Sequence, residues 1–376
     1  MDERALMQQA LALAQRSLNL SNPNPRVGCV LVGAAGAVIG QGHTQQAGGP
    51  HAEVMALRDA QTRGHSIVGA TAHVTLEPCS HHGRTPPCCD ALVAAGVSRV
   101  VVATTDPNPK VAGQGIERLR AAGVRVDLLP HDDPLARASR ELNIGFFSRM
   151  LRARPWVRMK IAASLDGITA LPNGQSQWIT SEAARTDGHH WRARACAVLT
   201  GIGTVREDDP RLDARIEGLQ RQPHLVVVDS RLETPVTARL FEPPASGPRR
   251  IWIAHAVDSA AAQALQARGA ETWHIPGPGG KTDLVALMSA LARHEVNELH
   301  VEAGAKLNAS LLKAGVVDEV LAYMAPRLLG TGAGMAALGP FEQLAQGIAL
   351  RYVDVQQQGV DLRVRAVVDG RDSFIA

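Results

Sequence analysis

The sequence predicts an α/β protein of two domains. Its 376 residues, 45% of them hydrophobic, exceed what one hydrophobic core usually serves. In both halves, strand-like apolar runs alternate with helix-like amphipathic segments. No Gly- or Ser-rich stretch separates the halves, so we expect a short connection near residue 150. The expected domains are residues 1–150 and residues 151–376.

The first half is expected to form a three-layer α/β/α domain. A 3.6-residue apolar period predicts a helix over residues 2–20, and Pro23 and Pro25 must end it. Pro50 suits the first turn of a second helix, which runs to about Thr62. We expect the strands at residues 27–32, 38–42, 73–77, 99–104 and 124–128. We expect further helices at residues 88–95, 115–122 and 134–151.

The second half repeats the alternation and ends in an antiparallel pair. We expect its strands at residues 157–163, 197–199, 225–229, 251–254, 298–302 and 317–324, then 351–355 paired with 361–367. Residues 243–248 and 276–280 are surface loops by composition. No G-x-G-x-x-G follows a strand, so a nucleotide cofactor would need a different binding loop from the standard dinucleotide fingerprint.

Composition argues against several classes of protein. A net charge of +3, 3% aromatic residues and no basic tract disfavour nucleic-acid binding. No run approaches the length of a membrane span, and the first residues lack a signal-peptide pattern. The five cysteines form an odd set without disulfide-framework spacing. We therefore expect a cytoplasmic protein with reduced thiols that can bind metal.

The most informative stretch runs from His51 to Cys88. His51, Cys79 and Cys88 offer one nitrogen and two sulfurs, which zinc accepts, and a fourth position remains for water. Glu53 is then available to carry protons beside that water. The order H-x-E, then P-C and a second cysteine, is typical of zinc deaminases. Zinc lowers the pKa of its bound water toward ~7, which makes hydroxide available for attack on an amine-bearing ring carbon.

Several alternatives stay open for the metal site. A structural zinc would normally have four protein ligands. Cys89 could replace Cys88, and His81 and His82 could also act as ligands. Cys29 lies in a strand pattern and is expected in the core.

Two further points concern geometry. Residues two apart do not share a helix face, so spacing alone does not show that His51 and Glu53 reach one metal. If Cys88 begins a helix, the positive end of that helix would favour its thiolate form.

The spacing of the cysteines and the later motifs resemble one family. Eight residues separate Cys79 from Cys88, and the run P-C-S-H-H-G-R-T-P-P-C resembles the riboflavin-biosynthesis deaminase. Three later motifs resemble the pyrimidine reductase half of the bifunctional deaminase–reductase: K-I-A-A-S-L-D-G at 160–167, S-Q-W-I-T at 176–180 and D-D-P-x-L at 208–212. The resemblance extends over nearly the whole chain. It implies a cytidine-deaminase-like domain followed by a dihydrofolate-reductase-like domain.

The resemblance also implies two consecutive reactions. The first is zinc-dependent hydrolytic deamination of 2,5-diamino-6-hydroxy-4-(5-phosphoribosylamino)pyrimidine, with Glu53 as the catalytic residue. The second is NADPH-dependent reduction of the ribosyl group of 5-amino-6-(5-phosphoribosylamino)uracil to ribityl. We expect a homo-oligomer that acts on these small molecules. The rival hypotheses are another nucleobase or tRNA-adenosine deaminase with an accessory domain, and a non-catalytic nucleotide-binding regulator with structural zinc.

Contacts with the deaminase substrate follow from the resemblance alone. Arg84 takes the position of a basic residue that meets the substrate phosphate, which a guanidinium can grip with two hydrogen bonds. Asn and Asp beside Pro are also what ordinary turns favour. The implied substrate residues are Asn24, His43, Arg84, Asp106 and Asn108.

Contacts in the reductase half follow in the same way. The cofactor residues are Ala162, Trp178, Thr204, Asp208, Ser230, Gly304, Ala305, Lys306, Leu307, Asn308, Ala309 and Ser310. The substrate residues are Ser176, Arg192, Leu212, Arg215 and Glu302. The start of a helix expected at residues 307–314 suits pyrophosphate, and Ser230 with Arg231 could recognise a 2′-phosphate.

Other roles remain open for some of these reductase residues. Trp178 could instead be a core aromatic residue, Arg192 a solvated helix residue and Asp208 a turn cap. Lys160, Asp208 and Glu302 are possible proton donors, and the sequence does not choose among them.

Overall fold

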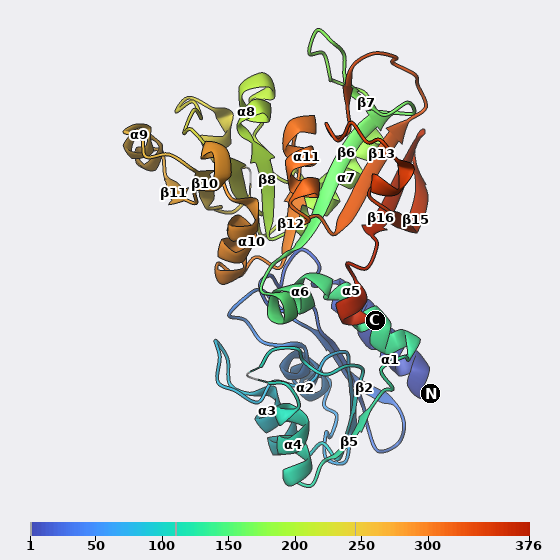
Figure 1. Cartoon of the computed structure of the whole chain (residues 1–376). Coiled ribbons are helices and arrows are strands. Elements are labelled where there is room, and N and C mark those ends of the chain that lie inside the picture. The colour runs from blue at the N-terminus through green and yellow to red at the C-terminus, as the bar shows by residue number, and fades with distance from the viewer. Residues whose placement is uncertain (1, 110, 245) are drawn as a thin grey trace. The chain divides into compact units, whose positions relative to one another are not determined.

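A computed structural model describes residues 2–109, 111–244 and 246–376. The chain divides into two compact units (Figure 1). The first contains Met1–Ala153 together with Phe374–Ala376, and the second contains Arg154–Ser373. Within the described residues, every helix is too short or too polar to cross a membrane.

The first unit is built on a five-stranded sheet in the order β2-β1-β3-β4-β5. β1 pairs antiparallel with β2 and β3, whereas β3, β4 and β5 run parallel. Helices α1 and α5 lie on one face of the sheet, and α2, α3 and α4 lie on the other (Figure 1). The strands are β1 Gly28–Val32, β2 Val38–His43, β3 Thr71–Val74, β4 Arg99–Val102 and β5 Arg125–Leu128. The helices are α1 Glu3–Gln15, α2 Ala52–Thr62, α3 Cys88–Ala94, α4 Gln114–Ala121, α5 Pro134–Leu142 and α6 Ile144–Arg152.

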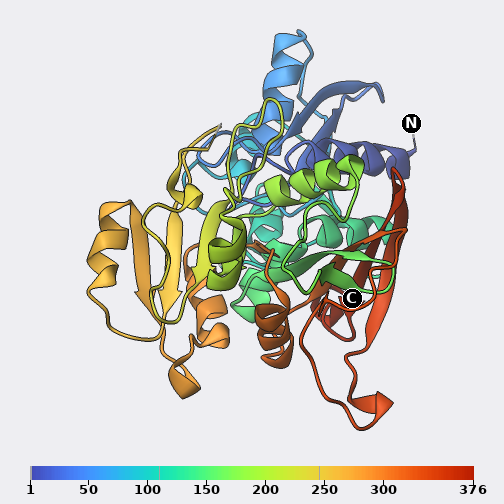
Figure 2. The ribbon, with the colours of Figure 1, turned by 90° about the horizontal axis from the view of Figure 1, so that it is seen from above.

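The second unit contains a nine-stranded sheet in the order β11-β10-β9-β8-β12-β6-β13-β16-β15. Figure 2 shows this sheet reaching from the orange strands at one edge to the red strands at the other. The seven neighbouring strands from β11 through β6 to β13 run parallel. β16 pairs antiparallel with β13, and β15 pairs antiparallel with β16. Its strands are β6 Trp156–Ser164, β8 Ala197–Gly201, β9 His224–Val228, β10 Ile251–His255, β11 Ala270–His274, β12 Glu298–Val301, β13 Glu319–Ala325, β15 Leu350–Gln358 and β16 Asp361–Val368. Its helices are α7 Glu182–Arg194, α8 Ile202–Asp208, α9 Ala261–Ala267, α10 Leu284–Arg293 and α11 Ala305–Lys313.

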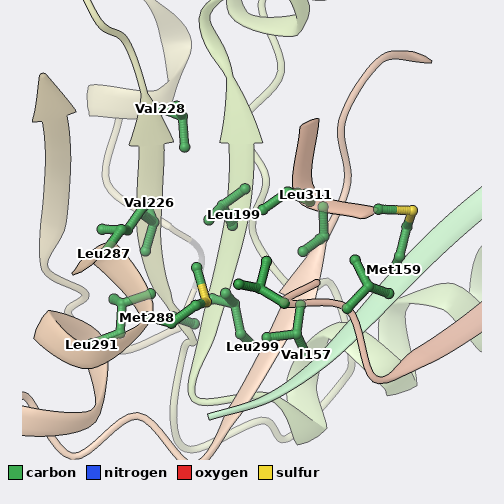
Figure 3. Close-up of a cluster of buried hydrophobic side chains, with 14 of the residues drawn as sticks. Val157, Met159, Leu199, Val226, Val228, Leu287, Met288, Leu291, Leu299 and Leu311 are labelled. Carbon is green, nitrogen blue, oxygen red and sulfur yellow. The ribbon is translucent and has the colours of Figure 1, made fainter. Parts of the chain in front are cut away.

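The main core of the second unit lies between the sheet and helices α10 and α11 (Figure 3). Val157 and Leu299 from the sheet and Leu287 from α10 are each 0% exposed. Burial of one such side chain stabilises the fold by about 1.5–3 kcal/mol, so this layer holds the helices on the parallel strands. The carboxyl ends of parallel strands share one edge, where ligand sites of α/β proteins usually form.

Residues 374–376 pack against the first unit. Ile375 is 4% exposed, and its carbonyl oxygen accepts a hydrogen bond from Arg140 Nε at 2.8 Å. The guanidinium of Arg152 lies 4.2 Å from the centre of the Phe374 ring. These contacts account for the assignment of the three residues to the first unit.

The structure corrects several predicted element boundaries. The helix predicted over residues 2–20 ends at Gln15. The helix predicted over residues 134–151 is two helices, because Asn143 turns its side chain to the backbone of Arg26: its Oδ1 accepts from Arg26 N at 2.7 Å, and its Nδ2 donates to Arg26 O at 2.9 Å. Pro50 precedes the N-cap residue His51 and does not lie in the first turn.

Three strands of the second unit were not predicted, and its helices α7, α8, α9 and α10 were given no range from the sequence. β11 is an edge strand with the sequence A-E-T-W-H, which lacks an apolar run. β7 Ile168–Ala170 and β14 Ala333–Gly334 pair only with each other and are too short for a period to show. Helices α8 and α9 have seven residues each, which is about two turns and too short for a 3.6-residue apolar period to show.

Candidate active sites

The predicted metal ligands meet at one place in the first unit. Ligand atoms of His51, Cys79 and Cys88 all lie within 4.8 Å of one another. His51 Nδ1 lies 3.6 Å from Cys79 Sγ and 3.4 Å from Cys88 Sγ, so this nitrogen faces both sulfurs. One imidazole nitrogen and two sulfurs fit zinc and leave its fourth tetrahedral position for another ligand. The second ring nitrogen, Nε2, lies 3.4 Å from Thr85 Oγ1, a partner that would orient the ring.

Glu53 lies in the first turn of α2 and is 3% exposed. Burial and the nearby Cys79 sulfur raise the pKa of Glu53 to about 7, although His51 and a hydrogen bond with Cys88 oppose the rise. His51 adopts an extended backbone at the N-cap position, with φ −78° and ψ 171°, instead of a helical one. The helix-face argument therefore does not apply to this pair, and both side chains reach the cluster.

The other possible ligands lie differently. Cys89 is 0% exposed, and its thiol donates to the carbonyl oxygens of Pro78 at 3.2 Å and Gly115 at 3.4 Å. Within the described residues, neither Cys89, His81 nor His82 belongs to the group that could hold a metal.

The helix that begins at Cys88 donates a hydrogen bond to the sulfur of Cys79. The first amide of α3 donates to Cys79 Sγ at 3.3 Å. The Cys88 thiol, His51 and this amide lower the pKa of Cys79 to about 4, although burial opposes the change. The pKa of Cys88 is raised, first by its hydrogen bond to Cys79 and then by burial. The prediction that the helix end favours the Cys88 thiolate was therefore wrong, because the helix begins at Cys88 and its first amide points to Cys79.

The predicted deaminase substrate residues differ in exposure. Asp106 is 8% exposed, and burial raises its pKa to about 7. Its Oδ1 accepts the backbone N–H of Asn108 at 2.8 Å, so these two residues form one turn. His43 is partly buried beside Ser17 Oγ at 3.2 Å. Asn24 is partly buried, and Arg84 is exposed in the loop between the cysteines.

In the second unit, predicted substrate residues form a charged cluster. Arg192 on α7 binds Glu302, which directly follows β12, with Nε–Oε1 at 2.7 Å and Nη2–Oε2 at 2.9 Å. Lys160 Nζ lies 4.0 Å and His300 Nε2 lies 3.4 Å from the same carboxylate. Burial alone would raise the pKa of Glu302, but Arg192 and its other partners hold it well below the usual value. Burial lowers the pKa of Lys160.

Arg215 and Leu212 lie beside this cluster. Arg192 also donates to the backbone oxygen of Asp213, whose carboxylate binds Arg215 Nη1 at 2.8 Å. Leu212 is 5% exposed and has a left-handed φ of 53°. The backbone N–H of Arg215 donates to His189 Nδ1 at 3.2 Å. Burial, Arg192 and Arg215 lower the pKa of His189 to about 4, so its ring is neutral and can accept this bond.

Sequence reasoning missed His189 and His300, although signals were present. His189 lies three residues before Arg192 on α7, and His300 lies two residues before Glu302 at the end of β12. Spacing alone could have placed each of them beside a predicted substrate residue.

The predicted cofactor residues lie along the carboxyl edge of the sheet. Gly304 is the N-cap of α11, and nothing lies within 4 Å of a Cβ built there. A Cβ on Gly201 would lie 2.9 Å from Leu307 Cδ2, so the loop after β8 and the start of α11 pack together. Ser230 Oγ lies 3.1 Å from Thr282 Oγ1 and accepts its backbone N–H at 3.0 Å.

The remaining predicted residues are spread over neighbouring elements. Thr204 and Asp208 lie on α8, Ala162 lies on β6, and Ser176 precedes α7. Trp178 is 62% exposed beneath Arg185, whose guanidinium lies 4.5 Å from the ring centre, so the alternative that it is a core aromatic residue was wrong.

Comparison with known proteins agrees with this architecture. Residues 1–104 match the cytidine and deoxycytidylate deaminase zinc-binding region, and residues 155–364 match the RibD C-terminal domain. The riboflavin biosynthesis protein RibD of Escherichia coli K12 is 43% identical over 98% of this chain and 100% of its own length. That of Aquifex aeolicus is 37% identical over 96% of this chain and 97% of its own length.

Solved structures give the same result. Acinetobacter baumannii RibD superimposes with a TM-score of 0.87 at 40% identity, covering 97% of this chain and 98% of that one. A diaminohydroxyphosphoribosylaminopyrimidine deaminase/5-amino-6-(5-phosphoribosylamino)uracil reductase from Thermotoga maritima gives 0.82 at 30% identity, covering 97% and 98%.

The fold and the site chemistry define a zinc-dependent deaminase of the cytidine-deaminase class joined to an NADPH-dependent reductase. The predicted fold class is confirmed. The chain belongs to the RibD family, the bifunctional deaminase–reductases of riboflavin biosynthesis.

Proposed function

We propose that residues 1–150 deaminate 2,5-diamino-6-hydroxy-4-(5-phosphoribosylamino)pyrimidine and that residues 151–376 reduce the product with NADPH. Full-length similarity to relatives with this pair of activities supports the assignment. The observation that carries it is the meeting of His51, Cys79 and Cys88 beside the buried Glu53. The reactions are consecutive, because deamination yields the uracil whose ribosyl group is reduced to ribityl.

In the deaminase step, His51, Cys79 and Cys88 hold zinc. Bound zinc supplies a water molecule of lowered pKa. Glu53 accepts a proton from the attacking water and delivers protons to the ring nitrogen and the departing ammonia. A carboxyl group with a pKa near 7 suits both directions of transfer.

The substrate is held by residues around that centre. Asn24 and His43 contact the pyrimidine, and the exposed Arg84 binds the phosphate. Asp106 and Asn108, which share one turn, contact the ribose. The burial of Asp106 and the partial burial of Asn24, His43 and Asn108 support their role as the walls of a site, with Arg84 at its mouth.

In the reductase step, the residues at the sheet edge bind NADPH and orient its nicotinamide against the sugar carbon that bears nitrogen. The open start of α11 at Gly304 receives the pyrophosphate, and Ser230 faces the 2′-phosphate. The substrate lies against Ser176, Arg192, Leu212, Arg215 and Glu302. Lys160, whose pKa burial lowers, is the proton donor best placed beside Glu302.

The exposed edge strand β15 supports a homo-oligomer. Tyr352 is 73% exposed, Val355 is 55% exposed and Val353 is 46% exposed on a strand with one unpaired side in the described sheet. An apolar edge of this kind is a template for pairing with another chain. We expect Tyr352→Lys combined with Val355→Lys to shift sedimentation toward a smaller species. The five unpaired cysteines support a reducing, cytoplasmic setting.

One coupled assay tests the proposed function. The diamino substrate is supplied to zinc-loaded protein with and without NADPH, and ammonia and NADPH are followed together. Ammonia release is expected in both cases, and NADPH oxidation is expected to follow only after ammonia appears. Ammonia release without any later NADPH oxidation would reject the reductase half alone, and NADPH oxidation without ammonia release would reject the order of the two steps.

A further inference from the structure

Glu77 is a buried carboxylate that directly precedes the Pro-Cys pair of the metal motif. It is 3% exposed. Its Oε1 accepts the backbone N–H groups of Gly115 at 2.9 Å and Ile116 at 3.3 Å. Its Oε2 accepts those of Asp106 at 3.1 Å and Gly113 at 3.0 Å. Four amides thus converge on one side chain.

All four amides come from the chain between β4 and the first turn of α4. Buried charge is costly unless hydrogen bonds compensate it, and bonds from N–H groups to a carboxylate are among the stronger ones. The side chain of Glu77 therefore joins the loop that carries Cys79 to the segment that carries Asp106 and Asn108. Its partners lie 29 to 39 residues away in sequence.

Close backbone packing supports the same junction. A Cβ on Gly115 would lie 2.1 Å from the carbonyl oxygen of Pro78, so only glycine allows this approach. The Cys89 thiol donates to the carbonyl oxygens of both residues. Arg118 on α4 donates from Nη1 to Ser80 O at 3.0 Å.

We propose that Glu77 is a positioning residue of the deaminase, which sets the distance between the metal centre and the ribose contacts of the substrate. It acts through Asp106, whose backbone N–H it accepts and whose carboxylate accepts Asn108 N–H. Glu77 itself does not touch the reacting atoms. The inference rests on the proposed function, in which Asp106 and Asn108 contact the substrate.

Glu77→Gln tests the role, because the glutamine NH₂ group would face two backbone N–H groups that need an acceptor. We expect the deaminase KM to rise about tenfold or more while kcat stays within about threefold. Zinc content and reductase kinetics should match the unsubstituted chain. Hydrogen exchange should accelerate at the amides of residues 106, 113, 115 and 116. Glu117→Gln, at an exposed position on α4, is the matched control. It should leave the KM, the zinc content and the hydrogen exchange unchanged.

An unchanged KM in Glu77→Gln, or a loss of zinc that explains the whole loss of activity, would overturn the proposal. If that variant does not fold, Gly115→Ala tests the same junction with the carboxylate intact, and it too should raise KM with zinc retained. A normal KM there would also overturn it.

Asp106→Ala separates this inference from the proposed function. A raised KM in Asp106→Ala with a normal KM in Glu77→Gln would remove only the positioning role. A normal KM in Asp106→Ala would remove the substrate contact and the positioning role together. Failure of the unsubstituted chain to release ammonia would reject the proposed deaminase itself.

Discussion

Arg192 and Glu302 form a two-point ion pair, with both guanidinium–carboxylate contacts at or below 2.9 Å. Their side chains are only 13% and 15% exposed. The pair keeps the carboxylate charged and leaves Arg192 Nη1 on the backbone of Asp213. Two residues predicted separately as substrate contacts therefore depend on each other.

Arg192→Lys should impair the reductase selectively. Lysine carries the same charge but cannot offer two parallel hydrogen bonds to a carboxylate, so Glu302 would lose its fixed orientation. We expect reductase kcat/KM to fall about tenfold or more, with deaminase kinetics unchanged. Arg206→Lys, on the exposed side of α8, serves as the control. Equal activity in the two variants would contradict the role assigned to the pair.

Glu53→Gln should abolish deamination while the protein keeps its zinc. The amide fills the same buried space but cannot carry protons, and general acid–base catalysis typically contributes about 10²–10⁴-fold. Ammonia release should fall by at least that factor, whereas reduction of supplied deaminated substrate should continue. Normal ammonia release would exclude Glu53 as the proton carrier.

Alanine substitution at the adjacent cysteines should distinguish their roles. Cys88→Ala removes a sulfur that faces His51 Nδ1, so zinc bound per chain should drop sharply. Cys89→Ala removes a buried thiol that donates to the backbone oxygens of Pro78 and Gly115, so zinc should remain and stability should fall by about 1–2 kcal/mol. Metal analysis after dialysis measures both. The opposite pattern would make Cys89 the ligand.

His224 should make the second unit sensitive to acid. Burial, with help from Arg221 and Arg250, lowers the pKa of His224 to about 4, and its Nδ1 accepts the Arg250 N–H at 3.2 Å. The unfolded chain has a histidine pKa of about 6.5 and binds more protons between these values. The stabilising contribution is therefore complete above about pH 6.5 and is lost as the pH falls toward about 4.

Tryptophan fluorescence can measure this effect in the intact chain. All five tryptophans lie in the second unit, so their signal reports on its unfolding alone. The free energy of unfolding should fall by about 1–3 kcal/mol between about pH 7 and 5. His224→Gln should make this decrease smaller, and His190→Gln, at an exposed position, should not. Identical pH profiles for all three proteins would contradict the assignment to His224.

The sequence predicted the zinc cluster because its ligands lie in short motifs with characteristic spacing. It also predicted that candidate cofactor residues of the second half follow strands, and parallel strands place their following loops on one edge of a sheet. It could not predict the break at Asn143, whose partner Arg26 is 117 residues away. The contacts of Glu77 could not be predicted either. Its partners are backbone amides, and every non-proline residue has one, so the sequence does not indicate which amides it binds.

The placement of residues 374–376 has a consequence for synthesis on the ribosome. Residues 1–153 emerge first, yet their compact unit includes Ile375, whose carbonyl oxygen satisfies Arg140. Arg140 is 3% exposed, so its guanidinium lacks one hydrogen-bond partner until more than two hundred further residues have been translated. Most of the deaminase unit is therefore translated before the reductase unit, and its last contact is translated after it. A nascent chain that stops before Phe374 would carry a deaminase unit without the hydrogen bond from Arg140 to Ile375.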